Sequence, residues 1–259
     1  MSQKALEFKS DIIIGKNFNV HSDILKENRG ISIGLPAHYE ETKEKYDVLF
    51  VLDGYFNAAY GVADFLSMEA EKAPPLIVVT IHNTDRMRDM SPTNSLISWD
   101  GKAYDEFKSS GGADNFLNFI GLELLPIINW GYRTTGSNIL AGHSLSGLTV
   151  LYALQNYAHL FDGYISVDPS YWWDNELILK EENIAKLNNL KTPKKLYFNL
   201  SQHHPDNLME EKGSGIFLRI LKRKAFKNLN YNYSHLKKES HDSMVLKSIY
   251  EALEFIYKK

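Results

Sequence analysis

Short apolar runs alternate with amphipathic segments along most of this chain, and the alternation predicts strands separated by helices. Residues 47–54 and 75–81 are nearly continuous apolar runs, which is typical of strands buried on both faces of a parallel sheet. Residues 30–36 alternate as a strand does, and a weaker strand candidate precedes them near residues 11–14. The same patterns predict later strands at residues 138–142, 163–167, 195–200 and 231–236.

Between these strands, apolar side chains recur at helical spacing. Helices are predicted over residues 58–71, 113–130, 148–159, 177–190, 216–226 and 244–257, with a polar loop at residues 82–110. Strands that alternate with helices are the signature of an α/β fold. We therefore predict a central, mostly parallel twisted sheet of about eight strands with helices on both faces.

The composition, with 44% apolar and 24% charged residues, is that of an ordinary soluble globular protein. No Pro/Gly/Ser-rich linker or charge block divides the 259 residues, so we predict a single domain over residues 1–259. The 29 basic and 32 acidic residues are mixed along the chain and leave a formal net charge of −3. This charge pattern excludes the electrostatic footprint of a nucleic-acid-binding protein.

Cysteine is absent, which excludes disulfides, thiolate chemistry and cysteine metal sites. No apolar run approaches the roughly 18 residues of a membrane span, so we expect a soluble protein. The first residues lack the apolar segment of a signal peptide, and the sequence leaves open both the cytoplasm and, after removal of such a peptide, the periplasm. It also leaves the oligomeric state open.

Residues 142–147 read Gly-His-Ser-Leu-Ser-Gly between a predicted strand and a predicted helix. A G-x-S-x-G pattern in that context is typical of the nucleophile elbow of an α/β-hydrolase fold, whose tight turn exposes the serine at the carboxyl end of the sheet. Ser146 stands at the second glycine position and is small enough to fit, and Gly147 follows it. We therefore predict the α/β-hydrolase fold with Ser144 as nucleophile, and an ordinary strand-to-helix turn is the alternative.

A serine hydroxyl needs a base within hydrogen-bond reach, most often a histidine. Five histidines follow Ser144 in the chain: His159, His203, His204, His235 and His241. His241 lies in a polar loop between the last predicted strand and the terminal helix, where this fold places its base. We predict His241 as the base, and a solvated loop histidine is the alternative.

A carboxylate should orient the base and stabilise its protonated form. Asp206 is the first carboxylate after the penultimate predicted strand, and we favour it, although it could equally cap the next helix. Asp168, which follows the preceding strand, and Glu239, two residues before His241, are alternatives. A Ser-His dyad oriented by a backbone carbonyl is also open.

The backbone N–H groups of Leu145 and Tyr55 are the predicted oxyanion donors, because they follow the nucleophile and the buried strand 47–54. Trp172 and Trp173 follow a strand at the catalytic edge and are predicted to wall an acyl or aryl pocket; core packing beneath a loop is the alternative. Arg86 is a candidate for binding an anionic substrate group, but it could instead brace its loop through carboxylates.

The pair His203-His204 lacks further ligands, and the chain has no nucleotide-binding or H-E-x-x-H motif. We therefore predict no metal and no cofactor.

Several separate motifs, in the same order, make the chain resemble the putative-esterase family of enterobactin trilactone esterases, esterase D-like enzymes, some feruloyl esterases and mycolyltransferases. They lie at residues 46–54, 84–92, 111–117, 123–126, 132–134, 142–147 and 168–174. The resemblance covers most of the chain and is strongest to the compact trilactone-esterase-like branch. It implies roles for Ser144, His241, Leu145 and Tyr55. The chain departs from the family at two points: the elbow reads Ser146-Gly147 where the family has Gly-Gly, and no acid directly follows Leu200, which leaves the acid open.

We therefore predict a serine esterase that hydrolyses a small-molecule carboxylic ester through an acyl-serine intermediate. An acyltransferase using the same acyl-enzyme is an alternative, and so is a non-catalytic binding protein with a relict site.

Overall fold

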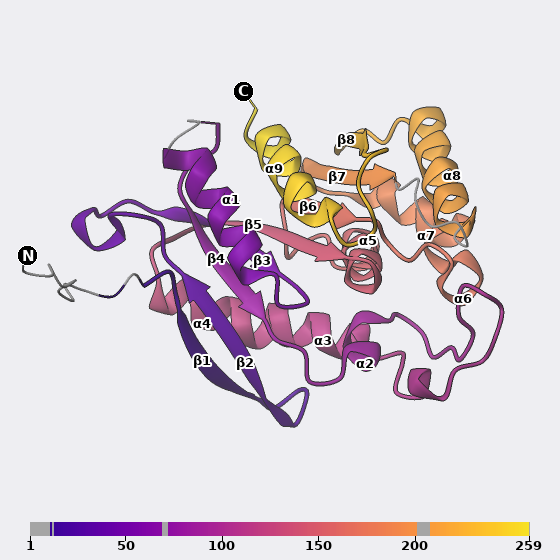
Figure 1. Ribbon diagram of the computed structural model, residues 1–259, viewed down its shortest axis with the longest axis horizontal. Coiled ribbons are helices and arrows are strands. Elements are labelled where there is room, and N and C mark those ends of the chain that lie inside the picture. The colour runs from indigo at the N-terminus through magenta and orange to yellow at the C-terminus, as the bar shows by residue number, and fades with distance from the viewer. Residues whose placement is uncertain (1–10, 12, 69–71, 201–207, 259) are drawn as a thin grey trace, which may run out of the picture.

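One eight-stranded sheet organises the computed structural model, which describes residues 11, 13–68, 72–200 and 208–258 (Figure 1). Its strands are β1 (Lys16–Ser22), β2 (Glu27–Gly34), β3 (Tyr46–Val51), β4 (Leu76–Ile81), β5 (Thr134–His143), β6 (Gly163–Val167), β7 (Lys194–Leu200) and β8 (Leu229–His235). They lie in the order β1-β2-β4-β3-β5-β6-β7-β8. The pairings of β1 with β2 and of β2 with β4 are antiparallel, and all the others are parallel. The predicted mostly parallel sheet is confirmed.

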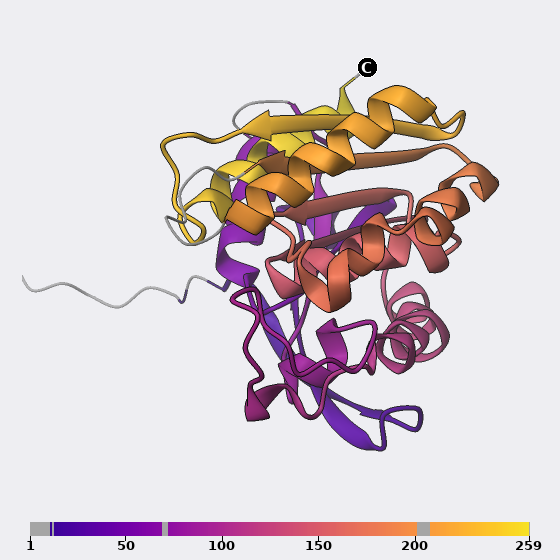
Figure 2. The ribbon, with the colours of Figure 1, turned by 90° about the vertical axis from the view of Figure 1, so that its right-hand side faces the viewer.

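Helices cover both faces of this sheet (Figures 1 and 2). The helices are α1 (Phe56–Met68), α2 (Arg86–Met90), α3 (Ala113–Phe119), α4 (Leu125–Gly131), α5 (Leu145–Asn156), α6 (Trp173–Glu176), α7 (Glu181–Ala185), α8 (Leu208–Lys224) and α9 (Met244–Tyr257). α1 and α9 pack on one face, whereas α3, α4, α5 and α8 pack on the other. Shorter helical turns lie at Tyr39–Glu41, Asp105–Phe107, Ile120–Leu124, Leu177–Leu179 and Lys186–Asn189. Within the described residues, no helix is both long and apolar enough to cross a membrane.

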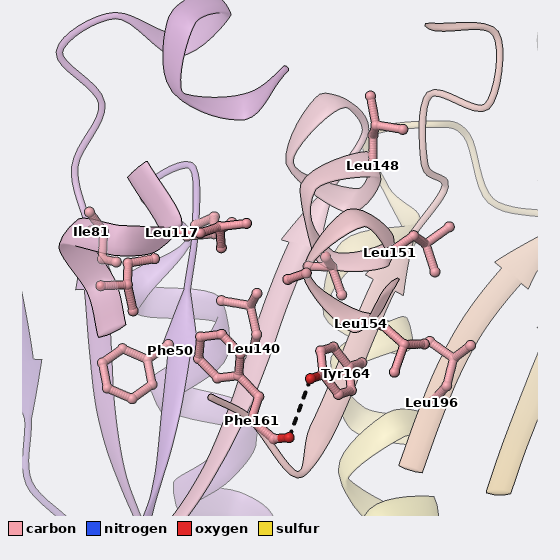
Figure 3. Close-up of a cluster of buried hydrophobic side chains, with 14 of the residues drawn as sticks. Phe50, Ile81, Leu117, Leu140, Leu148, Leu151, Leu154, Phe161, Tyr164 and Leu196 are labelled. Carbon is pink, nitrogen blue, oxygen red and sulfur yellow. Dashed lines mark hydrogen bonds between the residues drawn. The ribbon is translucent and has the colours of Figure 1, made fainter. Parts of the chain in front are cut away.

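The side chains of the central strands alternate strictly between the two layers. Val48 and Phe50 of β3 belong to the cluster beneath α3, α4, α5 and α8, whereas Leu49 and Val51 belong to the cluster beneath α1 and α9. Figure 3 shows the first cluster, in which three leucines of α5 lie over side chains of the strands. Because both faces are buried, the central strands read as continuous apolar runs in the sequence.

Two predicted elements are wrong. The first strand is Lys16–Ser22 instead of residues 11–14, and its sequence signal is weak because this edge strand is mostly exposed and pairs on one side only. The single helix predicted at residues 177–190 is divided into three short pieces: Lys180 interrupts it with an extended ψ of 144°, and α7 changes at residue 186 into a turn of 3-10 helix. The predicted polar loop at residues 82–110 also contains the short helix α2.

A buried ion-pair network fastens α2 to strand β2. The side chains of Arg29 and Asp89 are both 0% exposed, and Arg29 Nη2 lies 2.7 Å from Asp89 Oδ2. Arg88 joins the network through Asp89 at 2.8 Å and Glu27 at 2.8 Å. Glu27 also pairs with Arg29. The network therefore fixes the loop after β4, which carries Arg86, against the antiparallel edge of the sheet.

The first prediction is that Asp89→Asn lowers the free energy of unfolding by about 3–5 kcal/mol, because a buried cation then lacks its fully buried counter-charge. Urea unfolding followed by circular dichroism measures this change. Asp105→Asn is the matched control, since Asp105 pairs with Lys108 at 3.0 Å while its side chain is 88% exposed. The control should change stability by less than about 1 kcal/mol. Equal, small effects of the two substitutions would contradict a structural role for the network.

Candidate active site

Ser144 occupies the sharp turn between β5 and α5, with backbone angles φ 60° and ψ −120°. These angles are rarely adopted by residues with a side chain, and such strain is found at functional sites. The Ser144 N–H donates to the Val167 carbonyl at 2.9 Å, which ties the turn to the end of β6. The turn leaves Ser144 partly exposed at the carboxyl end of the sheet, as a nucleophile elbow requires.

Two glycines allow α5 to approach the strands this closely. A Cβ atom on Gly142 would lie 2.5 Å from the Ser146 carbonyl oxygen, and one on Gly147 would lie 2.8 Å from the Val167 carbonyl oxygen. Ser146 fits between them because its Oγ accepts from the His143 N–H at 2.8 Å and donates to the His143 carbonyl at 2.9 Å. The departure of Ser146 from the glycine pattern is thus accommodated by hydrogen bonds inside the elbow.

His241 pairs with a carboxylate at the same edge of the sheet. Its Nδ1 lies 2.6 Å from Asp168 Oδ2, and the Asp168 side chain is only 4% exposed. Asp168 directly follows β6, and its own N–H donates to Asn199 Oδ1 at 2.7 Å. The His241 ring centroid lies 4.3 Å from that of His143, the residue before Ser144. The structure therefore gathers Ser144, His241 and Asp168 at one edge.

The acid favoured by the sequence, Asp206, lies outside the described residues. Of the two alternatives, Glu239 accepts a hydrogen bond from Ser243 at 2.8 Å, and Asp168 is the carboxylate bonded to His241. Chain order alone does not separate Asp168 from Asp206, because both stand between Ser144 and His241 and both follow a predicted strand. The order of the strands in the sheet brings Asp168 close to the elbow, because the strand ending at Val167 is hydrogen-bonded directly to the strand that carries Ser144.

His143, which the sequence analysis did not single out, lies beneath the site. The residue is only 4% exposed, and its Nδ1 lies 3.0 Å from Tyr55 Oη. Burial, together with the nearby His241, lowers the pKa of His143 to about 4. A neutral imidazole therefore packs beside His241 at neutral pH without adding a like charge to the site.

The predicted oxyanion donors flank the elbow. Leu145 is the first residue of α5, where backbone N–H groups lack partners within the helix. Tyr55 follows a turn in which Gly54 has φ 75°, and the preceding Leu52 N–H donates to the Ala141 carbonyl at 2.9 Å. This bond holds the Tyr55 loop beside the strand that leads into Ser144. The catalytic roles of both N–H groups stay predictions.

Arg86 braces that loop through Asp53. Its Nε and Nη2 donate to the two carboxylate oxygens of Asp53 at 2.9 and 2.8 Å, and Asn83 donates at 2.7 Å. Burial would raise the pKa of Asp53, but the hydrogen bonds and charge of Arg86 outweigh it and hold that pKa below its usual range. Arg86 therefore braces its loop through a carboxylate, which was the alternative interpretation of this residue. Its contact with an anionic substrate group stays a prediction.

The two tryptophans differ in exposure. Trp173 is 0% exposed, donates from Nε1 to Thr93 at 3.2 Å, and packs against Phe107 with ring centroids 5.7 Å apart. Trp172 is partly exposed and stacks on Phe107 at 6.5 Å. Trp173 therefore follows the core-packing alternative, whereas Trp172 keeps surface for a ligand and its binding role stays a prediction.

One protein family matches most of this chain. A family model described as putative esterase matches residues 22–235. The siderophore enterobactin esterase of Emericella nidulans is 39% identical over 77 residues, which are 29% of this chain and 25% of that protein. The ferri-bacillibactin esterase BesA of Bacillus subtilis is 27% identical over 155 residues, which are 58% of this chain and 53% of that protein. The matched segments thus span from a quarter to about half of these relatives' lengths.

Solved structures match over nearly the whole chain. An IroE-like serine hydrolase from Shewanella oneidensis superposes with a TM-score of 0.87 and 31% identity, covering 94% of this chain and 80% of that one. The BES protein of Bacillus cereus superposes with a TM-score of 0.84 and 26% identity, covering 98% of this chain and 100% of that one. The predicted fold and the resemblance stated from the motifs are confirmed.

The second prediction is that Arg86→Gln and Asp53→Asn each slow covalent labelling of Ser144 by a fluorophosphonate probe roughly ten- to a hundredfold. This loss is smaller than the hundred- to thousandfold loss that follows removal of an oxyanion donor. The double substitution should be little slower than either single one, because the two residues act as one pair. Arg219→Gln, an exposed arginine on α8, is the control and should label at the wild-type rate. Multiplying effects in the double variant would show that Arg86 does not act through Asp53.

Proposed function

The chain belongs to the putative esterase family, and from this premise we propose that it is a serine esterase acting through an acyl-serine intermediate. The observation that carries the proposal is the 2.6 Å hydrogen bond between His241 and Asp168 at the sheet edge where the strained Ser144 lies. A nucleophile, a base and an orienting carboxylate are the groups that ester cleavage needs.

In the proposed reaction, Ser144 Oγ attacks the ester carbonyl while His241 Nε2 takes the hydroxyl proton. The Asp168 carboxylate accepts from the His241 Nδ1–H, which fixes the tautomer and stabilises the imidazolium. The N–H groups of Leu145 and Tyr55 are assigned to the developing oxyanion. His241 then gives its proton to the departing alcohol, which leaves the acyl-serine.

In the second half, water attacks the acyl-serine with His241 again as base, and the acid product leaves as Ser144 regains its proton. No cofactor enters either half-reaction. A competing alcohol that intercepted the acyl-enzyme efficiently would favour the acyltransferase alternative over hydrolysis.

We propose an ester-linked siderophore as the substrate class, because the enterobactin and ferri-bacillibactin esterases among the relatives are named for such compounds. The test is a panel of trilactone, acetyl, long-acyl and feruloyl esters compared by kcat/KM. The highest kcat/KM is expected for the trilactone. A preference for another ester would assign the chain to another branch of the family while leaving the esterase proposal intact.

The third prediction is that Ser144→Ala and His241→Ala each reduce kcat for ester hydrolysis by roughly a millionfold while the circular dichroism spectrum is unchanged. Since the two residues act as one unit, the double variant should be little worse than either single one. Activity above about a tenth of the wild-type value in Ser144→Ala is incompatible with this assignment.

The fourth prediction identifies the acid. Asp168→Asn should lower kcat by about ten-thousandfold, because the amide favours the wrong tautomer of His241. Glu239→Gln, the matched control in the same loop as His241, and Asp206→Asn, the carboxylate favoured by chain order, should each cost less than about tenfold. A larger loss at Asp206 than at Asp168 would reverse the assignment, and small losses at all three positions would indicate a Ser-His dyad.

A further inference from the structure

We propose that the edge of the active site also forms a binding site for a divalent transition metal, with Zn²⁺ as the best-fitting ion and with His143, His241 and Asp242 as ligands. One ligand atom from each of these three residues lies within 4.8 Å of the others. Two imidazoles and one carboxylate form a ligand set that Zn²⁺ binds in proteins, with water completing the tetrahedron.

Both imidazoles already have the outer partners that a metal ligand needs. His241 Nδ1 lies 2.6 Å from the Asp168 carboxylate, and His143 Nδ1 lies 3.0 Å from Tyr55 Oη. In metal sites, the ring nitrogen that does not bind the metal commonly donates to a carboxylate or another oxygen, which fixes the ring and its tautomer. The two Nδ1 contacts therefore favour ligation through Nε2 of both rings.

The His143 ring provides an independent observation. Its Nε2 is buried and makes no hydrogen bond of good geometry in the part of the chain that the structure describes, and the residue is 4% exposed; a hydrogen bond between the ring and the His241 backbone acts on the pKa of His143 in the raising direction. A buried polar atom without a partner is uncommon in native proteins and calls for an explanation such as an ion. The His143 Nε2 lone pair would be satisfied by a metal that also contacts His241.

Asp242 completes the site from the solvent side. It is exposed and adjoins His241 in the loop between β8 and α9. Its carboxylate adds the negative charge that attracts a cation, and its exposure leaves the site open to ions from solution. The ion would thus bind between the buried His143 and the exposed Asp242.

If the proposed function holds, this metal is an inhibitor. Catalysis needs the Nε2 lone pair of His241 to take the Ser144 proton, and a bound ion occupies that lone pair. Zn²⁺ should therefore suppress hydrolysis reversibly, and a chelator should restore it. The binding itself does not depend on esterase activity.

The fifth prediction is that Zn²⁺ binds at His143, His241 and Asp242, and its first test measures this binding directly. Isothermal titration of ZnCl₂ into Ser144→Ala, which keeps all three ligands, should give one site per chain. MgCl₂ should give none, since Mg²⁺ prefers oxygen ligands. Asp242→Asn in the same background should weaken Zn²⁺ binding by at least about tenfold, the smallest loss expected even for an outer-shell partner. Absence of Zn²⁺ binding, or undiminished binding by the Asp242→Asn variant, would overturn the proposed site.

The second arm measures hydrolysis. Zn²⁺ should inhibit the wild-type protein with reversal by EDTA, and the Asp242→Asn variant, compared with its own rate in the absence of Zn²⁺, should need at least about tenfold more Zn²⁺ for half-inhibition. Asp23→Asn is the matched control, because Asp23 lies 3.8 Å from His21 with its side chain 88% exposed. It should leave the inhibition curve unchanged. Zn²⁺ binding by a protein that hydrolyses no ester would refute the esterase proposal and leave the metal site standing.

Discussion

The close approach of helix α5 to strands β5 and β6 is the constraint on which the candidate site depends. It requires glycine at positions 142 and 147, since a Cβ atom at either would meet backbone oxygen at 2.5 or 2.8 Å. It also forces Ser144 into backbone angles that cost conformational energy. The packing of the buried layers on both faces of β5 offsets this cost, because a turn between two well-packed elements cannot relax without disturbing the core.

A series of ion pairs links the antiparallel edge of the sheet to the predicted oxyanion loop and restrains that loop. The buried Arg29–Asp89 pair fixes α2, and Arg86 on the same helix grips Asp53 with two hydrogen bonds. Asp53 stands two residues before Tyr55, so the position of the Tyr55 N–H depends on contacts made far away in the fold. Electrostatic stabilisation of an oxyanion depends on donors held in place beforehand, and the predicted donor Tyr55 would receive such support from this network.

A feature of this structure could be predicted from the sequence when its signal lies within one short stretch of the chain. Buried parallel strands are continuous apolar runs, and the elbow is a short motif, so the sheet, Ser144 and the His241 loop could be read directly. The edge strand Lys16–Ser22 could not, because an exposed strand carries little apolar pattern. The Asp168–His241 contact joins residues 73 apart in the chain, and no local pattern indicates which strand end meets which loop. The sequence does not indicate the contacts of His143 for the same reason, since its partners Tyr55 and His241 are distant in sequence.

One hydrogen bond gives His241 both of its proposed properties. The Asp168 carboxylate makes the Nε2 of His241 a better proton acceptor by stabilising the imidazolium, and the same electron donation makes Nε2 a better metal ligand. A proton and a metal ion would therefore compete for the Nε2 lone pair of His241, and the residues around His241 determine which of the two binds. The neutral His143 beside His241 adds no charge that would oppose an imidazolium, and it also offers a second nitrogen donor to a metal. Of the three proposed ligands, only His241 takes part in the proposed catalytic hydrogen bonds, so the balance between proton and metal binding at its Nε2 depends on the other two, His143 and Asp242.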